Sequence, residues 1–423
     1  MNEVYIPEIF NENEGELHIE NVSLKSIAEK YGTPVYVTSA LRIEQNYNEI
    51  LQAFRKRLDN FSIKYAVKAN SNPNIIRILA KMGAGADVSN LTEYELAKLG
   101  GISDKKIIMT PNNMDAQSLR EMSKKGITIN FDDINQMNSV KDSLPEIVSF
   151  RINPGRGRGE FPGTTTAGPE AKFGLPLEKA MEGYSMAKEA GATKFGIHMM
   201  TGSNVLDPAY FGSISSVIFD LSIELSKKLG IEFSYIDIGG GFGVPYRPGE
   251  TRLDMDKVAE NICTEMKRKF SSAGLKIPDL YMEPGRYLVS DSTVLVGKVT
   301  NIKDNGKIFI GTDMGMTTLL RPALYGAYHH ISPVISGAKG KTIEHCKIVG
   351  QVCENTDVIG EGRTFPTLSV GDLLAVFNAG AYGYSMSMNF NGNLRPAEIL
   401  IRDGKDIIIR RRETVQDIVQ TVV

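Results

Sequence analysis

The first two-thirds of the chain repeats one pattern: a short apolar run, a polar loop and then an amphipathic stretch. Eight such runs predict β-strands, namely Ile63–Asn70, Ala84–Asn90, Lys106–Asn112, Ile127–Asp133, Ile147–Gly155, Lys194–Gly202, Tyr235–Gly243 and Leu280–Tyr287. Apolar residues spaced by three and four predict helices between them, for example over Pro73–Met82, Leu91–Leu99 and Ser215–Leu229. Strands that alternate with helices are typical of βαβ units in a parallel sheet.

Eight units over roughly 250 residues predict an α/β fold, a closed (β/α)8 barrel of the TIM type. The alternative is an open doubly wound sheet, but no strand–GxGxxG–helix unit occurs near the start of the chain. Residues with distinctive chemistry also gather at the C-terminal ends of the predicted strands, which share one face of a barrel. They are Lys68, Asp87, Asn153, His198, Gly239–Gly241 and Glu283–Arg286.

After about Asp291 the pattern changes, because apolar runs follow one another with turns and little helical spacing. These runs predict β-strands over Val294–Ile302, Ile308–Asp313, Cys346–Val352, Leu373–Phe377 and Glu398–Arg411. Polar turns such as Asp304–Gly306 and Asp403–Gly404 support this interpretation. We therefore predict an N-terminal segment (1–35) that packs with the β domain, a barrel (36–290) and a C-terminal all-β domain (291–423).

The composition is that of an ordinary globular protein. Of the 423 residues, 42% are hydrophobic and 23% are charged, and the net charge is −2 at pH 7. This charge provides no general attraction for nucleic acid or an anionic membrane, so neither is an expected partner. No uncharged apolar run of roughly 18 residues predicts a membrane span. The N-terminal run MNEVYIPEIF lacks the basic and apolar regions of a signal peptide.

The three cysteines, Cys263, Cys346 and Cys353, are too few and too scattered for a disulfide framework or a CxxC zinc site. Their number suits the reducing cytoplasm, where we expect the protein to be located. No metal site is predicted. A small anionic ligand could still be bound by local arginines.

Lys68 stands in the run KYAVKAN, directly after apolar strand residues. At the mouth of a barrel its amine would be partly desolvated, as Schiff-base chemistry with a carbonyl compound requires. A lone lysine at a strand end is more often a solvated surface residue. The choice between these interpretations depends on the other motifs.

Two further motifs could recognise a phosphorylated ring. The run YIDIGGGFG places Gly240 and Gly241 after a strand, where backbone N–H groups can approach a phosphate; a tight turn is the alternative. The run EPGR ends the last barrel strand. Its Glu283 could pair with a protonated pyridine nitrogen, and Arg286 could bind a phosphate or carboxylate, although a surface Glu/Arg pair is also common.

KYAVKAN, GGGFG and EPGR, in this order, resemble the fold-type III pyridoxal-phosphate decarboxylases, which combine an alanine-racemase-like barrel with a β domain. Three later segments are similar to diaminopimelate decarboxylases: RPALYGAYH (Arg321–His329), VGQVCENTDVIG (Val349–Gly360) and GDLLAVFNAGAYGYSMSMNFNG (Gly371–Gly392). The resemblance implies pyridoxal phosphate as cofactor. The implied reaction converts meso-2,6-diaminopimelate to L-lysine and CO2, the last step of lysine biosynthesis.

The resemblance also implies roles for matching residues. Lys68 would hold the cofactor as a Schiff base, and Cys353 would donate a proton after CO2 has left, although a free cysteine is usually a small buried residue. The implied cofactor neighbours are His198, Ser203, Gly240, Gly241, Glu283, Pro284, Gly285, Arg286 and Tyr382. The implied substrate-binding residues are Arg286, Arg321, Tyr325, Glu354 and Tyr382. In this family Cys353 and Glu354 would come from a second subunit, which implies a homodimer with shared active sites.

The chain departs from the family pattern at two places. The family has HxHIGSQ after the sixth strand, whereas this chain has HMMTGSN over residues 198–204, so Met200 replaces the ring-stacking histidine. Met200 could cover the ring through a sulfur–aromatic contact, and His198 is either a cofactor neighbour or a structural histidine. The second departure is the loop Gly155–Gly174, a candidate lid that could equally be a solvated surface loop.

These departures keep a second hypothesis open: a related decarboxylase acting on D-lysine, D-ornithine, L-ornithine or a carrier-bound amino acid. An amino-acid racemase would share the barrel, but it needs a second base, usually a tyrosine. Cys353 and Glu354 instead suit protonation after decarboxylation. A noncatalytic cofactor carrier is normally the barrel alone.

Overall fold

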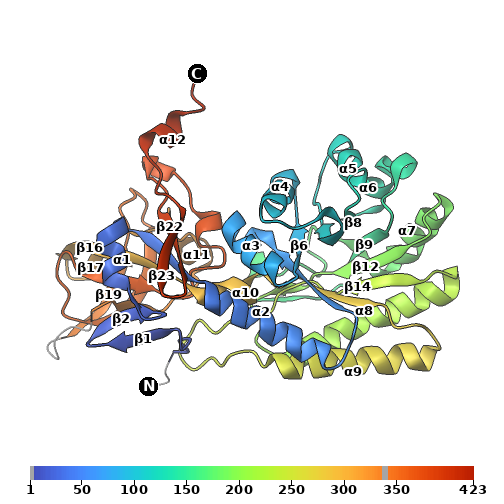
Figure 1. Ribbon diagram of the computed structural model, residues 1–423, viewed down its shortest axis with the longest axis horizontal. Helices are drawn as coiled ribbons and strands as arrows, with labels where there is room; N and C mark the ends of the chain where they lie inside the picture. The colour runs from blue at the N-terminus through green and yellow to red at the C-terminus, as the bar shows by residue number, and fades with distance from the viewer. Residues whose placement is uncertain (1–3, 336–341) are drawn as a thin grey trace. The chain divides into compact units, whose positions relative to one another are not determined.

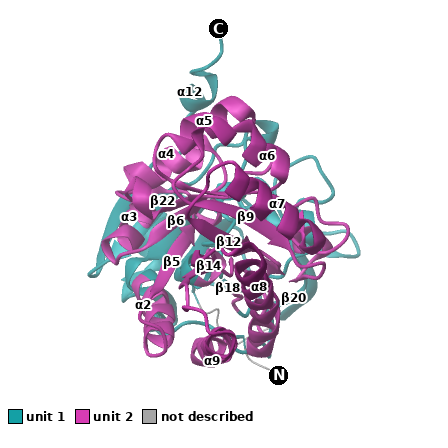
Figure 2. Cartoon of the chain, turned by 90° about the vertical axis from the view of Figure 1, so that its right-hand side faces the viewer, with its two compact units in different colours: residues 1–43, 245–251, 288–423 teal, residues 44–244, 252–287 magenta. Residues whose placement is uncertain are grey.

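The computed structural model describes residues 4–335 and 342–423, which form two compact units (Figures 1 and 2). We call residues 44–244 and 252–287 the barrel unit. The β unit consists of the described residues of 1–43, 245–251 and 288–423. None of the helices in the described part of the chain is both long and apolar enough to cross a membrane.

Eight parallel strands close the barrel, since each pairs with the next and β15 pairs back with β5. Around the barrel they are β5 (Phe61–Ala66), β6 (Gly85–Val88), β7 (Ile107–Met109), β8 (Thr128–Phe131), β9 (Val148–Asn153), β12 (Phe195–Met199), β14 (Phe233–Asp237) and β15 (Asp279–Met282). Each predicted strand overlaps one of these. The predicted (β/α)8 barrel with a β-rich C-terminal part is confirmed.

Helices alternate with these strands and surround them (Figure 2). They are α2 (Ala40–Arg55), α3 (Pro73–Lys81), α4 (Leu91–Leu99), α5 (Ala116–Ser123), α6 (Ile134–Ser139), α7 (Leu177–Glu189), α8 (Pro208–Leu229), α9 (Met255–Ala273) and α10 (Arg286–Val289). Helix α3 shows why they form here: the Asn72 side chain accepts from the Asn74 amide, Pro73 is the first helical residue, and Ile75 and Leu79 face the core.

Strand β5 is shorter than predicted. The predicted strand continues to Asn70, but β5 ends at Ala66, and Val67–Ala69 form the 3-10 turn η1. The Tyr65 hydroxyl donates to the carbonyl of Asn70 (2.8 Å) and so fixes the turn. Lys68 therefore lies in a turn at the end of the strand.

The β unit is built on a sheet of nine strands, with β20-β19-β17-β16-β4-β22-β23 in this order and β21 paired with both β16 and β18. Their bounds are β4 (Val35–Ser39), β16 (Thr293–Asp304), β17 (Ile308–Thr312), β18 (Ile331–Pro333), β19 (Thr342–Val349), β20 (Val358–Pro366), β21 (Leu373–Val376), β22 (Ala397–Arg402) and β23 (Lys405–Arg410). The predicted strand Glu398–Arg411 is therefore a hairpin, because its Asp403–Gly404 turn separates β22 from β23. The unit also has α11 (Arg321–Tyr325) and α12 (Val415–Val419).

The N-terminal segment belongs to the core of the β unit. It contains the small sheet β1 (Phe10–Asn13), β2 (Glu16–Ile19) and β3 (Val22–Ser23), followed by α1 (Leu24–Tyr31). Strand β4 lies between β16 and β22. One buried cluster combines both ends of the chain: Ile9, Phe10, Ile19, Leu24, Ile27, Ala28, Val35, Val37, Val294, Val296, Val334, Ala375, Phe377, Ala397, Ile399 and Ile401.

Residues 245–251 join the β unit, although the sequence places them within the barrel segment. The Asn378 side chain donates to the carbonyl of Pro245 (2.9 Å), and the hydroxyls of Tyr246 and Ser290 are 2.9 Å apart. These contacts explain the difference from the predicted boundaries. Whether the units fold independently, as the predicted domains would, stays a prediction.

The packing of the N-terminal segment predicts a stability effect. Ile27 is 1% exposed, so Ile27→Ala should lower the free energy of unfolding by about 2 to 5 kcal/mol. Ile6 lies in the same segment but is 37% exposed, so Ile6→Ala should cost less than about 1 kcal/mol. Chemical denaturation of the full-length protein measures both. Equal effects of the two variants would contradict this role of the segment.

Candidate active site

The C-terminal ends of the barrel strands bring several charged side chains to one mouth of the barrel. Lys68 follows β5, Asp87 lies in β6, His198 lies in β12, Asp237 ends β14 and Glu283 follows β15. Because the strands are parallel, these ends open on the same side. The structure thus brings the predicted residues together and adds Asp237, which the sequence analysis did not include.

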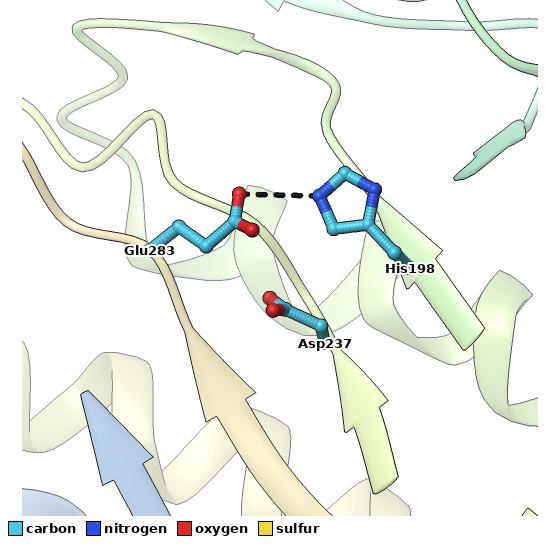
Figure 3. A group of neighbouring side chains, drawn as sticks. All are labelled: His198, Asp237 and Glu283. Atoms are coloured by element: carbon cyan, nitrogen blue, oxygen red, sulfur yellow. Dashed lines mark hydrogen bonds and ion pairs between the residues drawn. The ribbon is translucent and has the colours of Figure 1, made fainter. Parts of the chain in front are cut away.

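Glu283 and His198 point toward each other across this mouth (Figure 3). Nε2 of His198 lies 3.1 Å from Oε2 of Glu283, and both side chains are buried. Burial alone would raise the pKa of Glu283, but His198, followed by Lys68 and Arg151, together lower it. Glu283 is therefore an ionised carboxylate. Its Oε1 has no hydrogen-bond partner among the described residues.

Asp237 is the third member of this group (Figure 3). Burial raises its pKa well above the usual value and the nearby Glu283 raises it further, although the Gly239 amide donates to Oδ1 (2.9 Å) and opposes the shift. The surroundings thus favour the protonated form of Asp237 and the ionised form of Glu283. Ligand atoms of Asp237, Glu283 and His198 lie within 4.8 Å of one another. We assign no metal to this group, because His198 and Glu283 are already hydrogen-bonded to each other.

Lys68 forms an ion pair with Asp87 on the neighbouring strand. The Lys68 side chain is 40% exposed, whereas that of Asp87 is 1% exposed. Burial and the nearby Glu283 raise the pKa of Asp87 to about 6, although Lys68 opposes this shift. The buried carboxylate holds the Lys68 amine at the mouth, where it remains accessible.

The EPGR turn packs against the turn that carries Lys68. The Ala66 amide donates to the carbonyl of Pro284 (3.3 Å). A Cβ atom on Gly285 would lie 2.9 Å from Cβ of Ala69, so glycine permits this close approach. The glycine of the EPGR run is thus explained by the close packing of two strand ends.

Ser203, Arg286 and the glycine run lie together at the same mouth. Nη2 of Arg286 donates to Oγ of Ser203 (3.0 Å), and Gly241 has a φ of +94°. The Gly240 amide donates to Sδ of Met200 (3.2 Å). Because a thioether is a weak acceptor, a phosphate oxygen would compete well for this amide. A hydroxyl, a guanidinium and glycine amides form the donor set of an anion site.

The remaining predicted residues lie in the β unit. Arg321 begins α11 and is buried; its Nη1 donates to Nε2 of His329 (2.8 Å). Its guanidinium lies 4.6 Å from the ring centroid of Tyr246. Tyr325, the last residue of α11, is half-buried. Arg321 is thus held by its neighbours in a fixed orientation.

Cys353 and Glu354 are exposed in the turn before β20. The Asn391 side-chain amide donates to Sγ of Cys353 (3.3 Å). Tyr382 has a φ of +56°, a left-handed conformation that is uncommon and costly for an aromatic residue. Such strain is concentrated at functional sites, which supports a functional position for Tyr382.

A family described as "Pyridoxal-dependent decarboxylase, pyridoxal binding domain" matches residues 44–290, which include this barrel mouth. The chain belongs to this decarboxylase family. The resemblance noted in the sequence is thereby confirmed, and pyridoxal phosphate is the cofactor of the family.

Individual pyridoxal-dependent decarboxylases are similar to this chain over nearly its whole length. The diaminopimelate decarboxylase of Thermoplasma acidophilum is 42% identical, over 99% of this chain and all of the relative. That of Methanothermobacter thermautotrophicus is 38% identical, over 98% of this chain and 97% of the relative. The structure of diaminopimelate decarboxylase from M. jannaschii in complex with L-lysine has a TM-score of 0.90 and 32% identity, with 98% of both chains covered.

The sequence analysis missed two charged residues of this decarboxylase site. Asp237 is the last residue of strand β14, two positions before the glycine run, and Arg151 interrupts the apolar strand β9. Arg151 is buried, and it helps to lower the pKa of Glu283. A charged residue within an otherwise apolar strand was the available signal, because burial of an uncompensated charge is costly.

The ion pair between Lys68 and Asp87 predicts the pH at which the Asp87 carboxyl titrates. In the cofactor-free protein, the Asp87 carboxyl should titrate near pH 6. Lys68→Ala should raise this midpoint, because it removes the positive charge that favours the carboxylate. NMR of 13C-labelled aspartate measures it, with the exposed helix cap Asp115 as a control that should not move. An unchanged Asp87 midpoint in Lys68→Ala would show that the two groups are not coupled.

Proposed function

We propose that this protein decarboxylates meso-2,6-diaminopimelate to L-lysine and CO2 with pyridoxal phosphate, as the last step of lysine biosynthesis. The observation that carries the proposal is the similarity, over 97% or more of the chain, to several proteins named diaminopimelate decarboxylase. A further support is that one structural neighbour was solved with L-lysine, the product of this reaction.

The residues at the barrel mouth fit the cofactor. Glu283 is ionised and buried, and its Oε1 lacks a partner among the described residues, so it can accept a hydrogen bond from a protonated pyridine nitrogen. Lys68 would hold the cofactor covalently through its amine. The residues proposed to surround the ring and the phosphate are His198, Ser203, Gly240, Gly241, Pro284, Gly285, Arg286 and Tyr382. When bound, pyridoxal phosphate supplies an electron-withdrawing ring that accepts the electron pair left by CO2.

The substrate needs two further kinds of contact. Its distal end carries a carboxylate and an ammonium group. We assign Arg286, Arg321, Tyr325 and Tyr382 to the carboxylate end and Glu354 to the ammonium, because guanidinium and carboxylate groups complement these charges. The His329 contact would hold the Arg321 guanidinium ready for the planar carboxylate. Cys353 would deliver a proton from Sγ to the carbon that has lost CO2.

We also propose that the protein works as a homodimer in the cytoplasm. Cys353 and Glu354 are exposed on the β unit, which suits residues that complete the site of a second copy. All three cysteines are free, as expected in a reducing compartment.

A second candidate is decarboxylation of another amino acid, such as D-lysine, D-ornithine, L-ornithine or a carrier-bound one. The observation in its favour is Met200, whose Sδ accepts from the Gly240 amide, at the position of a histidine in the family pattern. Racemisation is a weaker candidate, because Cys353 and Glu354 replace the second base that it needs.

The first test is the reaction itself. Purified full-length protein with pyridoxal phosphate should release CO2 and L-lysine in equal amounts from meso-diaminopimelate, and Lys68→Ala should abolish both. Lys81→Ala is a control for the removal of a lysine from the same part of the chain, since Lys81 is exposed at the end of α3 and its loss should leave both products unchanged. Turnover of D-lysine or ornithine without turnover of diaminopimelate would replace the leading proposal by the second candidate.

The second test addresses the shared site. Cys353→Ala alone should reduce turnover by at least ~10-fold, because its thiol would deliver the proton. Coexpression of Lys68→Ala with Cys353→Ala chains should restore about a quarter of wild-type turnover, since half of randomly assembled dimers contain one intact site. If the coexpressed chains remain as inactive as the separate variants, Lys68 and Cys353 of different subunits do not form one site, and the shared-site proposal is wrong.

A further inference from the structure

The loop between β9 and α7, residues 155–174, is one of the two departures from the family pattern, and the structure shows how it is held. Its first part forms β10 (Arg158–Gly159), which pairs in parallel with β13 (Gly202–Ser203). The Glu160 amide extends the pairing by donating to the carbonyl of Ser203 (3.0 Å). This part of the loop is therefore hydrogen-bonded to the segment that carries a proposed phosphate ligand.

Glycines at positions 157 and 202 allow this pairing. A Cβ atom on Gly157 would lie 2.3 Å from the carbonyl oxygen of Thr201, and one on Gly202 would lie 1.7 Å from that of Arg158. Both separations are far shorter than a side chain tolerates, so both positions need glycine. Close backbone packing thus explains the glycine at position 157 of the loop.

The same segment is bonded to the glycine run on its other side. The Val205 amide donates to the carbonyl of Gly241 (3.0 Å), and the Gly243 amide donates to the carbonyl of Val205 (3.0 Å). Residues 202–205 therefore lie between the loop and the glycine run. All these residues belong to the barrel unit.

Asn204 links the loop to the glycine run with one side chain. Its Nδ2 donates to Oε2 of Glu160 (3.0 Å), and its Oδ1 accepts from the Val244 amide (2.9 Å). The orientation of the amide is determined, because a carboxylate accepts and a backbone N–H donates. Its φ of +58° is a left-handed conformation that asparagine tolerates better than most residues.

We propose that Asn204 and Glu160 are positioning residues that set the affinity for the phosphate group of the cofactor. Together they hold Ser203, which also accepts from Arg286, at a fixed separation from the glycine run. The loop 155–174 is then a fixed wall of the phosphate site and not a lid. This inference rests on pyridoxal phosphate being the cofactor, as proposed above.

A charge-rescue experiment tests the pair. Asn204→Asp keeps the acceptor for Val244 but places a second carboxylate against Glu160, so the Kd for pyridoxal phosphate should rise by at least ~10-fold. Adding Glu160→Gln should restore the Kd to within about threefold of wild type, because its amide can donate to the new carboxylate. Absorbance during titration of stripped full-length protein with pyridoxal phosphate measures each Kd. The kcat at saturating cofactor should change little.

Controls separate this role from general stability. Glu170→Gln changes an exposed carboxylate on the same loop and should leave the Kd unchanged. If Asn204→Asp does not fold, Glu160→Ala provides the second arm, with an expected rise of about threefold or more in Kd because one hydrogen bond to a charged group is lost. A wild-type Kd in Asn204→Asp or in Glu160→Ala, or no recovery in the double variant, would overturn the proposal.

Failure of the proposed reaction gives a different result. Wild-type protein that binds pyridoxal phosphate but forms no lysine would refute the diaminopimelate assignment, and the pattern of Kd values would still support or overturn the pair. Wild-type protein that does not bind pyridoxal phosphate would overturn both proposals.

Discussion

The charge on Glu283 depends on its contact with His198, and the chemistry of the barrel mouth depends on that charge. Three buried carboxyl groups lie near one another there, and an isolated buried carboxylate would take up a proton. The His198 contact lowers the pKa of Glu283, whereas burial raises the pKa of Asp237 well above its usual value and that of Asp87 to about 6. The same functional group, a carboxyl, thus has three different proton affinities within a single site, as expected when environment separates pKa values.

The fold makes this arrangement possible. Closure of β15 onto β5 brings the EPGR turn against the Lys68 turn, where Gly285 lets the two backbones meet. The carboxylate of Asp87 then holds Lys68 at the edge of the same site. On the other side, Asn204 joins the loop 155–174 to the glycine run. The two departures from the family pattern, Met200 and the loop 155–174, contact each other near the glycine run. The Thr166 hydroxyl of the loop donates to the carbonyl of Met200, and the Gly240 amide donates to Sδ of Met200.

Much of this could be predicted from the sequence, because apolar periodicity reports local structure. All eight barrel strands follow from it, and so does the position of Lys68 at a strand end. What could not be predicted depends on partners distant in sequence. Positions 157 and 202 need glycine only because β10 lies beside β13, and this pairing cannot be inferred from the local sequence. Residues 245–251 join the β unit through Ser290 and Asn378, which a local pattern does not reveal.

We propose that an ionised Glu283 accepts a hydrogen bond from the protonated pyridine nitrogen of the bound cofactor. The most direct measurement is 15N NMR of the full-length protein loaded with pyridoxal phosphate labelled at its ring nitrogen. The wild-type protein should show the chemical shift of a protonated pyridine near neutral pH, and Glu283→Gln should show that of an unprotonated one. An unprotonated nitrogen in the wild-type protein, or the same shift in both proteins, would contradict this account of the site.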